Sequence, residues 1–89
     1  MYEFRWNSWN RDHIDKHGVG TREAEYVVNH VRSPYPRREG RGKYTVRGQT
    51  RDGRYLQVVY IFSPRAVVYV IHARPLTDNE KQNLRRSQQ

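Results

Sequence analysis

Apolar residues follow two different spacings in the two parts of this chain. After a short alternating segment they recur at helical intervals up to about residue 31, whereas between residues 43 and 74 they alternate with polar residues or form short runs. This pattern predicts strands over residues 2–6, 43–51, 54–62 and 66–74, helices over residues 9–17 and 21–31, and a last helix that begins at Thr77. We therefore expect an α+β domain of order β-α-α-β-β-β-α, in which a small antiparallel sheet packs with two N-terminal helices and one C-terminal helix.

Capping residues indicate where the helices begin. Asn7 or Ser8 is a typical N-cap for the first helix, and Thr21 is a typical N-cap for the second. Thr77 and Glu80 form a T-x-x-E capping box, which predicts the start of the third.

The chain shows no repeat and no domain boundary, so residues 1–89 are expected to form a single domain. Residues 33–42 hold two prolines, two glycines and three arginines, a composition that predicts a mobile basic loop. The polar residues 85–89 are expected to form a flexible tail.

The dipeptide Asp52-Gly53 is a strong signal for a hairpin with a two-residue turn. Such a turn would pair Arg51 with Arg54, Gln49 with Leu56, Arg47 with Val58, and Thr45 with Tyr60, all on one face of the sheet. The other face would bury Tyr44, Val46, Tyr55, Val59 and Ile61. The first face would be cationic, and it is either an RNA-binding platform or an ordinary solvated face. In the first case we expect Arg47, Gln49, Arg51 and Tyr60 to bind RNA.

Basic residues outnumber acidic ones by 17 to 9, which gives a net charge of +8. Only three of the basic residues are lysines, and the planar guanidinium of arginine is well suited to phosphate contacts. RNA or DNA is therefore the first candidate partner, and an acidic protein would be attracted by the same field.

The chain contains no cysteine, which excludes disulfides, thiolate metal sites and a cysteine nucleophile. Its longest apolar run, residues 67–71, is far shorter than the roughly 18 residues of a membrane span, and no signal leader is visible at the N-terminus. We expect a soluble, cytoplasmic protein that has no membrane partner.

Three motifs occur in order along nearly the whole chain. They are F-x-W-N-x-W-N-x-x-H-I-x-K-H-G-V with a following E-A-E, then Y-x-V-x-G-Q-T-x-x-G-R-Y-L-x-V-V, then A-R-P-L-T-x-x-E. In these motifs and their separations the chain resembles the BrnT family of bacterial toxins. The resemblance implies a RelE-like ribonuclease fold, RNA cleavage that arrests growth, and neutralisation by an acidic antitoxin of the BrnA type. A module of the same fold that binds nucleic acid or docks the antitoxin without catalysis is the alternative.

Metal-independent RNA cleavage needs a base for the 2′-hydroxyl, an acid for the leaving 5′-oxygen and cations for the phosphate. The residues that match the family pattern predict that Arg54 and Arg74 hold the phosphate. Lys16 or His17, helped by His72, would transfer the protons, and His72 would also contact RNA. The sequence leaves open which residue is the acid and which the base, and no cofactor is expected.

The same residues have structural alternatives. Lys16 and His17 lie in the last turn of a helix, where cations stabilise the negative end of the helix dipole. Arg74 is able to form an exposed ion pair with Glu80. His72 lies on the cationic face or on the core face, depending on the number of residues in the turn at residues 63–65.

His13 and His17 have the spacing of helical zinc ligands, but Ile14 stands where the general base would be and no third ligand is evident. A metal site is therefore not expected. A domain of this size needs its aromatic residues inside, and so a core role is expected for Trp6, Trp9, Tyr26, Val27 and Val31.

Overall fold

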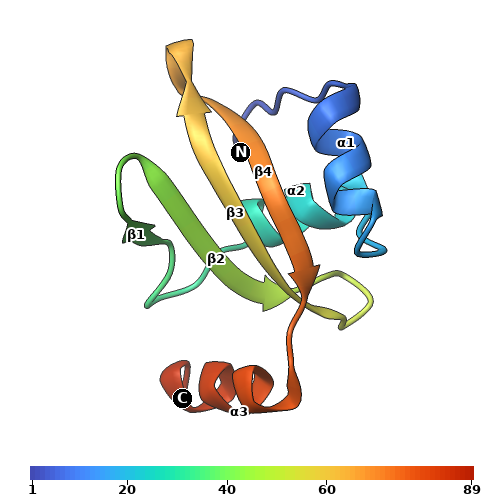
Figure 1. The fold of residues 1–89 in the computed structure, drawn as a ribbon. Coiled ribbons are helices and arrows are strands. Elements are labelled where there is room, and N and C mark those ends of the chain that lie inside the picture. Colours follow the sequence, from blue (N-terminus) through green and yellow to red (C-terminus); the bar gives the residue numbers. More distant parts are fainter.

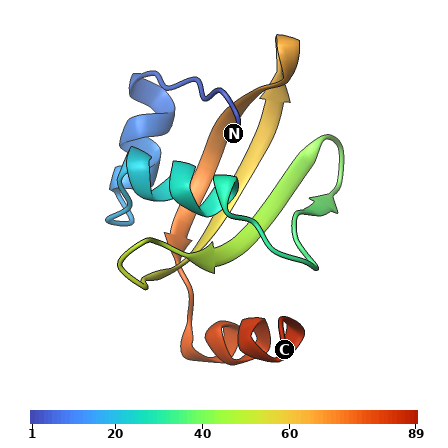
Figure 2. The ribbon, with the colours of Figure 1, turned by 180° about the vertical axis from the view of Figure 1, so that it is seen from behind.

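A four-stranded antiparallel sheet of order β1-β2-β3-β4 forms the centre of the molecule (Figure 1). The computed structural model describes residues 1–89 without a gap. The strands are β1 (Arg37–Glu39), β2 (Lys43–Gln49), β3 (Tyr55–Ser63) and β4 (Val67–Pro75), and the helices are α1 (Ser8–Asp15), α2 (Thr21–Asn29) and α3 (Asp78–Ser87). Helix α2 crosses one face of the sheet, α1 lies beside β4, and α3 lies beyond the end of β4 (Figures 1 and 2). The prediction of a small α+β domain with an antiparallel sheet is confirmed.

The predicted order of elements is wrong at two places, because the observed order is α-α-β-β-β-β-α. Residues 2–6 form no separate strand of the sheet and contribute one parallel bridge, from Phe4 to Val68 on the outer edge of β4. The predicted mobile loop contains strand β1, which pairs with Lys43–Thr45 of β2. Gly40 and Gly42 have positive φ angles of 64° and 72°, so the chain turns back there in a conformation that glycine adopts without strain.

The N-termini of α1 and α2 are capped in different ways. The side chains of Asn7 and Asn10 bond to each other's backbone N–H, so the prediction of Asn7 as a cap is confirmed. Thr21 is the first residue of α2 rather than its N-cap, and Gly20 takes the cap position. The carboxylate of Glu23 accepts the Gly20 N–H at 3.0 Å, so the helix end is satisfied without a capping hydroxyl.

Helix α3 begins at the predicted capping box and extends further than predicted. Thr77 Oγ1 accepts the Glu80 N–H, and the Glu80 carboxylate accepts the Thr77 N–H. The helix continues to Ser87, so most of the expected flexible tail over residues 85–89 is helical. Arg85 and Arg86 lie in its last turn, where cations stabilise the negative end of the helix dipole.

The β2–β3 hairpin has a different register from the one predicted. Thr50 N–H bonds to the Arg54 carbonyl at 2.8 Å, so three residues form the turn instead of two, and Gly53 has a φ of 90°. An odd turn shifts the pairing by one residue, which moves every side chain of β3 to the other face. Leu56, Val58 and Tyr60 are consequently buried, whereas Gln57 lies opposite Arg47. The predicted faces are correct for β2 and wrong for β3.

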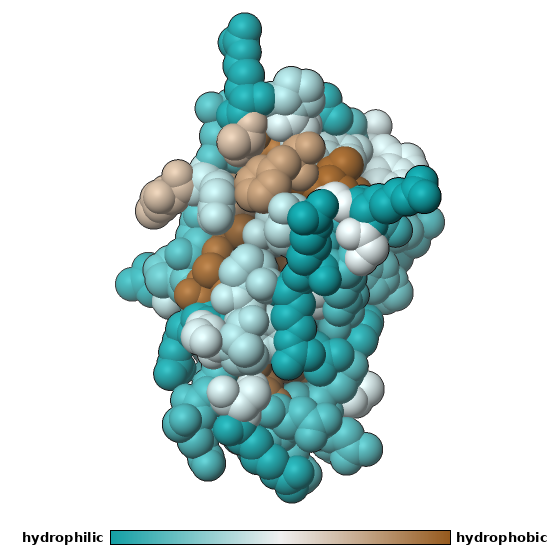
Figure 3. All heavy atoms as spheres, turned by 90° about the vertical axis from the view of Figure 1, so that its left-hand side faces the viewer, coloured by the Kyte–Doolittle hydropathy of each residue, from teal (hydrophilic) through white to brown (hydrophobic).

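The core lies between the sheet and the first two helices. The helical side and the connecting turn contribute Ile14, Val19, Ala24, Val27 and Val28, and the sheet contributes Val46, Leu56, Val58, Tyr60, Val68, Val70 and Ala73. Trp6 and Val31 pack against this core, as predicted. From the β1–β2 side the surface shows a small hydrophobic area in the upper half, whereas the lower part, where α3 lies, is hydrophilic (Figure 3). None of the helices has the length and apolarity that crossing a bilayer requires.

Candidate active site

Three histidine rings meet where α1 lies along β4. His13 lies in α1, His17 follows the C-cap of that helix, and His72 comes from β4. The ring centres are 5.1 Å apart for His17 and His72, 5.7 Å for His13 and His72, and 6.5 Å for His13 and His17. The sequence predicted Lys16 or His17, helped by His72, as the proton-transfer residues, and the structure brings His17 and His72 into contact.

A β-bulge sets the position of His72. Val59 of β3 pairs with His72 while the next residue, Tyr60, pairs with Val70, so Ile71 is an extra residue in β4. Beyond the bulge Ala73 is buried on the helix side, and its neighbours His72 and Arg74 therefore point to the other face. This answers the question that the sequence left open, because His72 lies outside the core.

The environment of His72 disfavours its protonated form. Burial is the main cause that lowers its pKa below the ordinary value of 6.5, and the charges of His17, His13 and Arg74 lower the pKa further. A neutral imidazole is thus favoured at this position, and neutral imidazole is the form that accepts protons.

Two further aromatic rings extend the histidine cluster toward the start of α1. The Trp9 ring is nearly parallel to the His13 ring, with an interplanar angle of 4° and a centroid distance of 5.1 Å. The Tyr69 ring lies 6.5 Å from Trp9, and the Arg5 guanidinium lies 4.6 Å from the centre of the Tyr69 ring. Trp9 is 57% exposed, so its predicted place in the core is wrong. The four-residue spacing of Trp9 and His13 agrees with their contact in the helix, but it does not indicate that the Trp9 ring is exposed.

Lys16 and Arg54 lie at the C-terminal end of α1, where Lys16 precedes His17 and Arg54 contacts Gly18, the residue after His17. Lys16 is the exposed C-cap residue of the helix. The Arg54 side chain donates to the carbonyl of Gly18 at 2.8 Å and to both carboxylate oxygens of Glu23 at 3.0 and 3.2 Å. Arg54 therefore ties the hairpin turn to the connection between α1 and α2, directly after His17.

Arg74 is held in an ion pair with Glu80, the structural alternative that the sequence offered. The two terminal nitrogens of the guanidinium each donate to one Glu80 oxygen at 2.8 Å. Arg47 donates to the same carboxylate at 3.0 Å and to Gln57 at 2.9 Å. The hydrogen bonds from Arg74 have the largest effect on the pKa of Glu80 and the bond from the Thr77 N–H has the next largest. Together with the charge of Arg47 they lower this pKa to about 2. The bond to Glu80 also raises the pKa of Arg74.

The remaining RNA-binding candidates occupy different places. Arg51 is exposed in the hairpin turn, and Gln49 is exposed with its side-chain amide donating to the Gly53 carbonyl at 3.1 Å. Tyr60 is only 1% exposed, and burial raises its pKa to about 12. The predicted role of Tyr60 as an RNA-stacking residue is therefore contradicted, because the three-residue turn directs its ring into the core.

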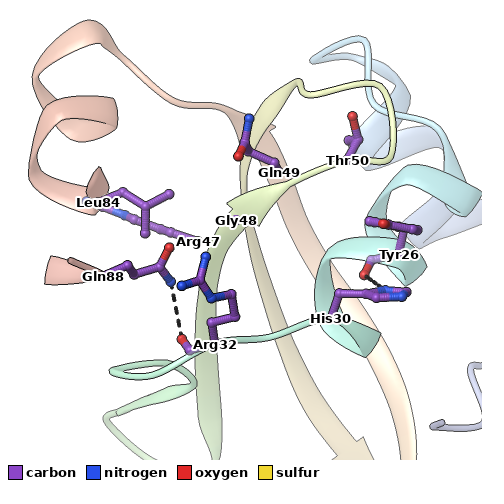
Figure 4. A pocket seen from close by; sticks show the side chains of 9 residues that line it. All are labelled: Tyr26, His30, Arg32, Arg47, Gly48, Gln49, Thr50, Leu84 and Gln88. Atoms are coloured by element: carbon purple, nitrogen blue, oxygen red, sulfur yellow. Dashed lines mark hydrogen bonds between the residues drawn. The ribbon is translucent and has the colours of Figure 1, made fainter. Parts of the chain in front are cut away.

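A pocket of about 250 Å³ lies at the outer edge of β2, between the end of α2 and α3 (Figure 4). Its lining includes Tyr26 from α2 and His30, which caps that helix, Arg47 and Gln49 from β2, and Leu84 and Gln88 from the C-terminal region. Strand β1 pairs with β2 only as far as Thr45, so no strand covers this part of the edge. The pocket contains two of the predicted RNA-binding residues and none of the histidines of the β4 cluster.

The described cluster combines two chemical abilities. Two contacting imidazoles can accept and donate protons, and the chain next to His17 carries Lys16 before it and the Arg54 contact on Gly18 after it. His13, His17 and His72 do not form a group that could hold a metal ion. Comparison of the chain with protein-family models, with curated proteins and with solved structures finds no match.

Proposed function

We propose that this chain is the RNA-cleaving toxin of a bacterial toxin–antitoxin pair, and that it acts in the cytoplasm by metal-independent acid–base chemistry. The observation that carries the proposal is the pair of imidazoles, His17 and His72, whose ring centres lie 5.1 Å apart in a chain with a net charge of +8. The RelE-like fold that the BrnT resemblance implies is part of the same proposal. A basic chain attracts RNA, and two adjacent imidazoles supply the proton transfers that cleavage requires.

In the proposed reaction His72 is the general base. Its neutral imidazole accepts the proton of a 2′-hydroxyl, and the 2′-oxygen attacks the neighbouring phosphorus. The bond between phosphorus and the 5′-oxygen breaks, and His17 donates the proton that this oxygen takes up. The products are a 2′,3′-cyclic phosphate and a 5′-hydroxyl, with His72 left protonated and His17 neutral. The lowered pKa of His72 supports this division of roles.

The cations have distinct roles in this mechanism. Lys16 forms no ion pair and is free to contact the phosphate oxygens as their charge increases. Arg54 adds positive charge at the same end of α1, although Glu23 partly compensates it. Arg74 is bound to Glu80 on both terminal nitrogens, so we assign it chiefly to positioning His72, two residues before it on β4.

The proposed antitoxin is an acidic protein of the BrnA type. Its negative charge would be attracted by the same surface that attracts RNA, so that binding of the antitoxin blocks access to the histidine cluster.

The test is cleavage of a long single-stranded RNA by the purified chain in the presence of EDTA. We expect fragments that end in 2′,3′-cyclic phosphate, and we expect His17→Asn and His72→Asn to lower the rate by at least about 100-fold. His30→Asn is the matched control, because His30 caps α2 and contacts Tyr26 instead of the cluster. All variants must melt at the temperature of the parent chain.

Two results would overturn the mechanism. Unchanged rates in both His17→Asn and His72→Asn would remove the imidazole pair from the chemistry. Tight RNA binding without cleavage by the parent chain would favour the alternative function, a nucleic-acid-binding or antitoxin-docking module.

A further inference from the structure

Trp9 is an exposed aromatic ring beside the candidate active site. More than half of its surface, 57%, is accessible, although indole is among the side chains that proteins most often cover. A domain with a small core gains stability when it buries such a ring. The stability of the fold therefore does not explain why Trp9 is exposed.

The surroundings of Trp9 are arranged as a stacking surface. The His13 ring is parallel to it within 4° and the Tyr69 ring within 15°. Both neighbours are themselves fixed: His13 also contacts His72 at 5.7 Å, and the Tyr69 hydroxyl bonds to the Asn7 side chain at 3.2 Å. The indole is consequently held in one orientation before any ligand arrives.

The charge around this surface also suits a nucleotide. The Arg5 guanidinium lies 4.6 Å from the centre of the Tyr69 ring, and Lys16 lies at the other end of α1. Aromatic rings and cations on the same segment offer both kinds of contact that a single-stranded nucleic acid makes, namely stacking of the base and pairing of its phosphates.

We propose that the exposed part of the Trp9 ring binds an unpaired nucleobase of the RNA substrate and thereby selects single-stranded RNA at the cleavage site. The inference rests on the proposed function, because it takes the His17–His72 pair as the cleavage site. Trp9 is one ring away from that pair, since His13 contacts both Trp9 and His72. A base in a duplex has both faces stacked on its neighbours and offers none to the indole.

The test uses the fluorescence of Trp9 and an uncleavable probe, a single-stranded 2′-O-methyl oligoribonucleotide of mixed sequence. We expect the probe to quench the emission of the parent chain, and we expect weaker quenching from a duplex of the same length and from a strand of the same charge whose bases are removed. In Trp9→Leu the quenching should disappear, because the remaining Trp6 is half-buried and bonded to Glu25.

Affinity for the same probe, measured by anisotropy of a labelled strand, gives the second readout. Trp9→Leu should bind about 10-fold more weakly, and Trp9→Phe should recover part of the loss. Phe62→Leu is the matched control, because Phe62 is also an exposed ring, with 39% of its surface accessible. Ile61 pairs with Tyr69 and shares its face of the sheet, so the next residue, Phe62, lies on the opposite face.

The outcomes separate this inference from the proposed function. If Trp9→Leu and the parent bind the probe equally, or if the base-free strand quenches as strongly as the complete one, the stacking site is refuted even where RNA is cleaved. If the parent chain cleaves no RNA but Trp9 still discriminates between the single strand and the duplex, the proposed function fails and the stacking site stands.

Discussion

At the scale of single residues, His72 has the most unusual environment of the proposed site. Its pKa lies below 6.5 because the ring is partly buried and because His17, His13 and Arg74 add positive charge around it. Protonation of His72 therefore destabilises the folded chain. The free energy of unfolding should decrease as the pH falls from 6.5, the ordinary pKa of histidine, toward the lower pKa that His72 has in the folded chain.

The histidine cluster thus makes a direct titration prediction. We expect the His72 ring signal to titrate with a midpoint below 6.5 in NMR spectra, and we expect His17→Asn to move that midpoint upward, because a positive neighbour is removed. His30→Asn should leave the midpoint unchanged. A His72 midpoint at or above 6.5 in the parent would contradict its assignment as the base.

At the scale of elements, Glu80 joins α3 to two strands. Its carboxylate binds Arg74 of β4 and Arg47 of β2, and it also closes the capping box of its own helix through the Thr77 N–H. The Glu80 side chain is only 18% exposed, so this junction is more protected from solvent than an ordinary surface ion pair.

Glu80→Gln should destabilise the fold by about 2 kcal/mol at neutral pH, since the amide keeps the cap but loses the charge between two arginines. The pKa of Glu80 in the folded chain is about 2. Its contribution is therefore complete above the ordinary pKa of about 4.5 and is lost as the pH falls toward 2. Chemical unfolding of both chains between neutral pH and about pH 3 should show the difference shrinking. Glu39→Gln in β1 is the control, and a difference independent of pH would argue against the ion pair.

Helices and strands differ in how far the sequence specified them. The N-cap at Asn7 and the capping box at Thr77 depend on residues within one turn of each other, and local signals therefore identified them. Strand β1 depends on a pairing between residues 37–39 and β2, and the basic composition of that segment concealed it. The hairpin register depends on one residue in the turn, because Asp52-Gly53 fits both a two-residue and a three-residue turn. That single residue accounts for the wrong placement of Tyr60.

At the scale of the whole molecule, the proposed site combines segments that are distant in the sequence. The residue types of the site were predictable, because Lys16, His17, Arg54 and His72 were identified from motifs and chemistry. The participation of Trp9 and Tyr69 was not predictable, since it requires α1 to lie along β4 with its aromatic side outward. The ion pair of Arg54 with Glu23 was equally unspecified, because any of nine carboxylate residues offers a partner, whereas the pair of Arg74 with Glu80 was an alternative that the sequence offered.

The net charge of +8 predicts that binding of a single-stranded oligonucleotide weakens steeply with salt. Lys16→Ala and Arg51→Ala should each reduce the slope of log affinity against log salt by about 1, because both side chains are exposed and form no ion pair. Arg65→Asn, in the turn at the other end of β4, is the control, and asparagine tolerates the φ of 67° found there. A slope that stays the same in both alanine variants would place the nucleic acid on another surface.

Cleavage of a DNA strand that contains a single ribonucleotide tests the central claim most directly, because only one 2′-hydroxyl is present. In EDTA the parent chain should cut this strand only after the ribonucleotide and leave a 2′,3′-cyclic phosphate, and His72→Asn should leave the strand intact over the same time. Cleavage at deoxynucleotides, or cleavage by His72→Asn at the parent rate, would contradict the account.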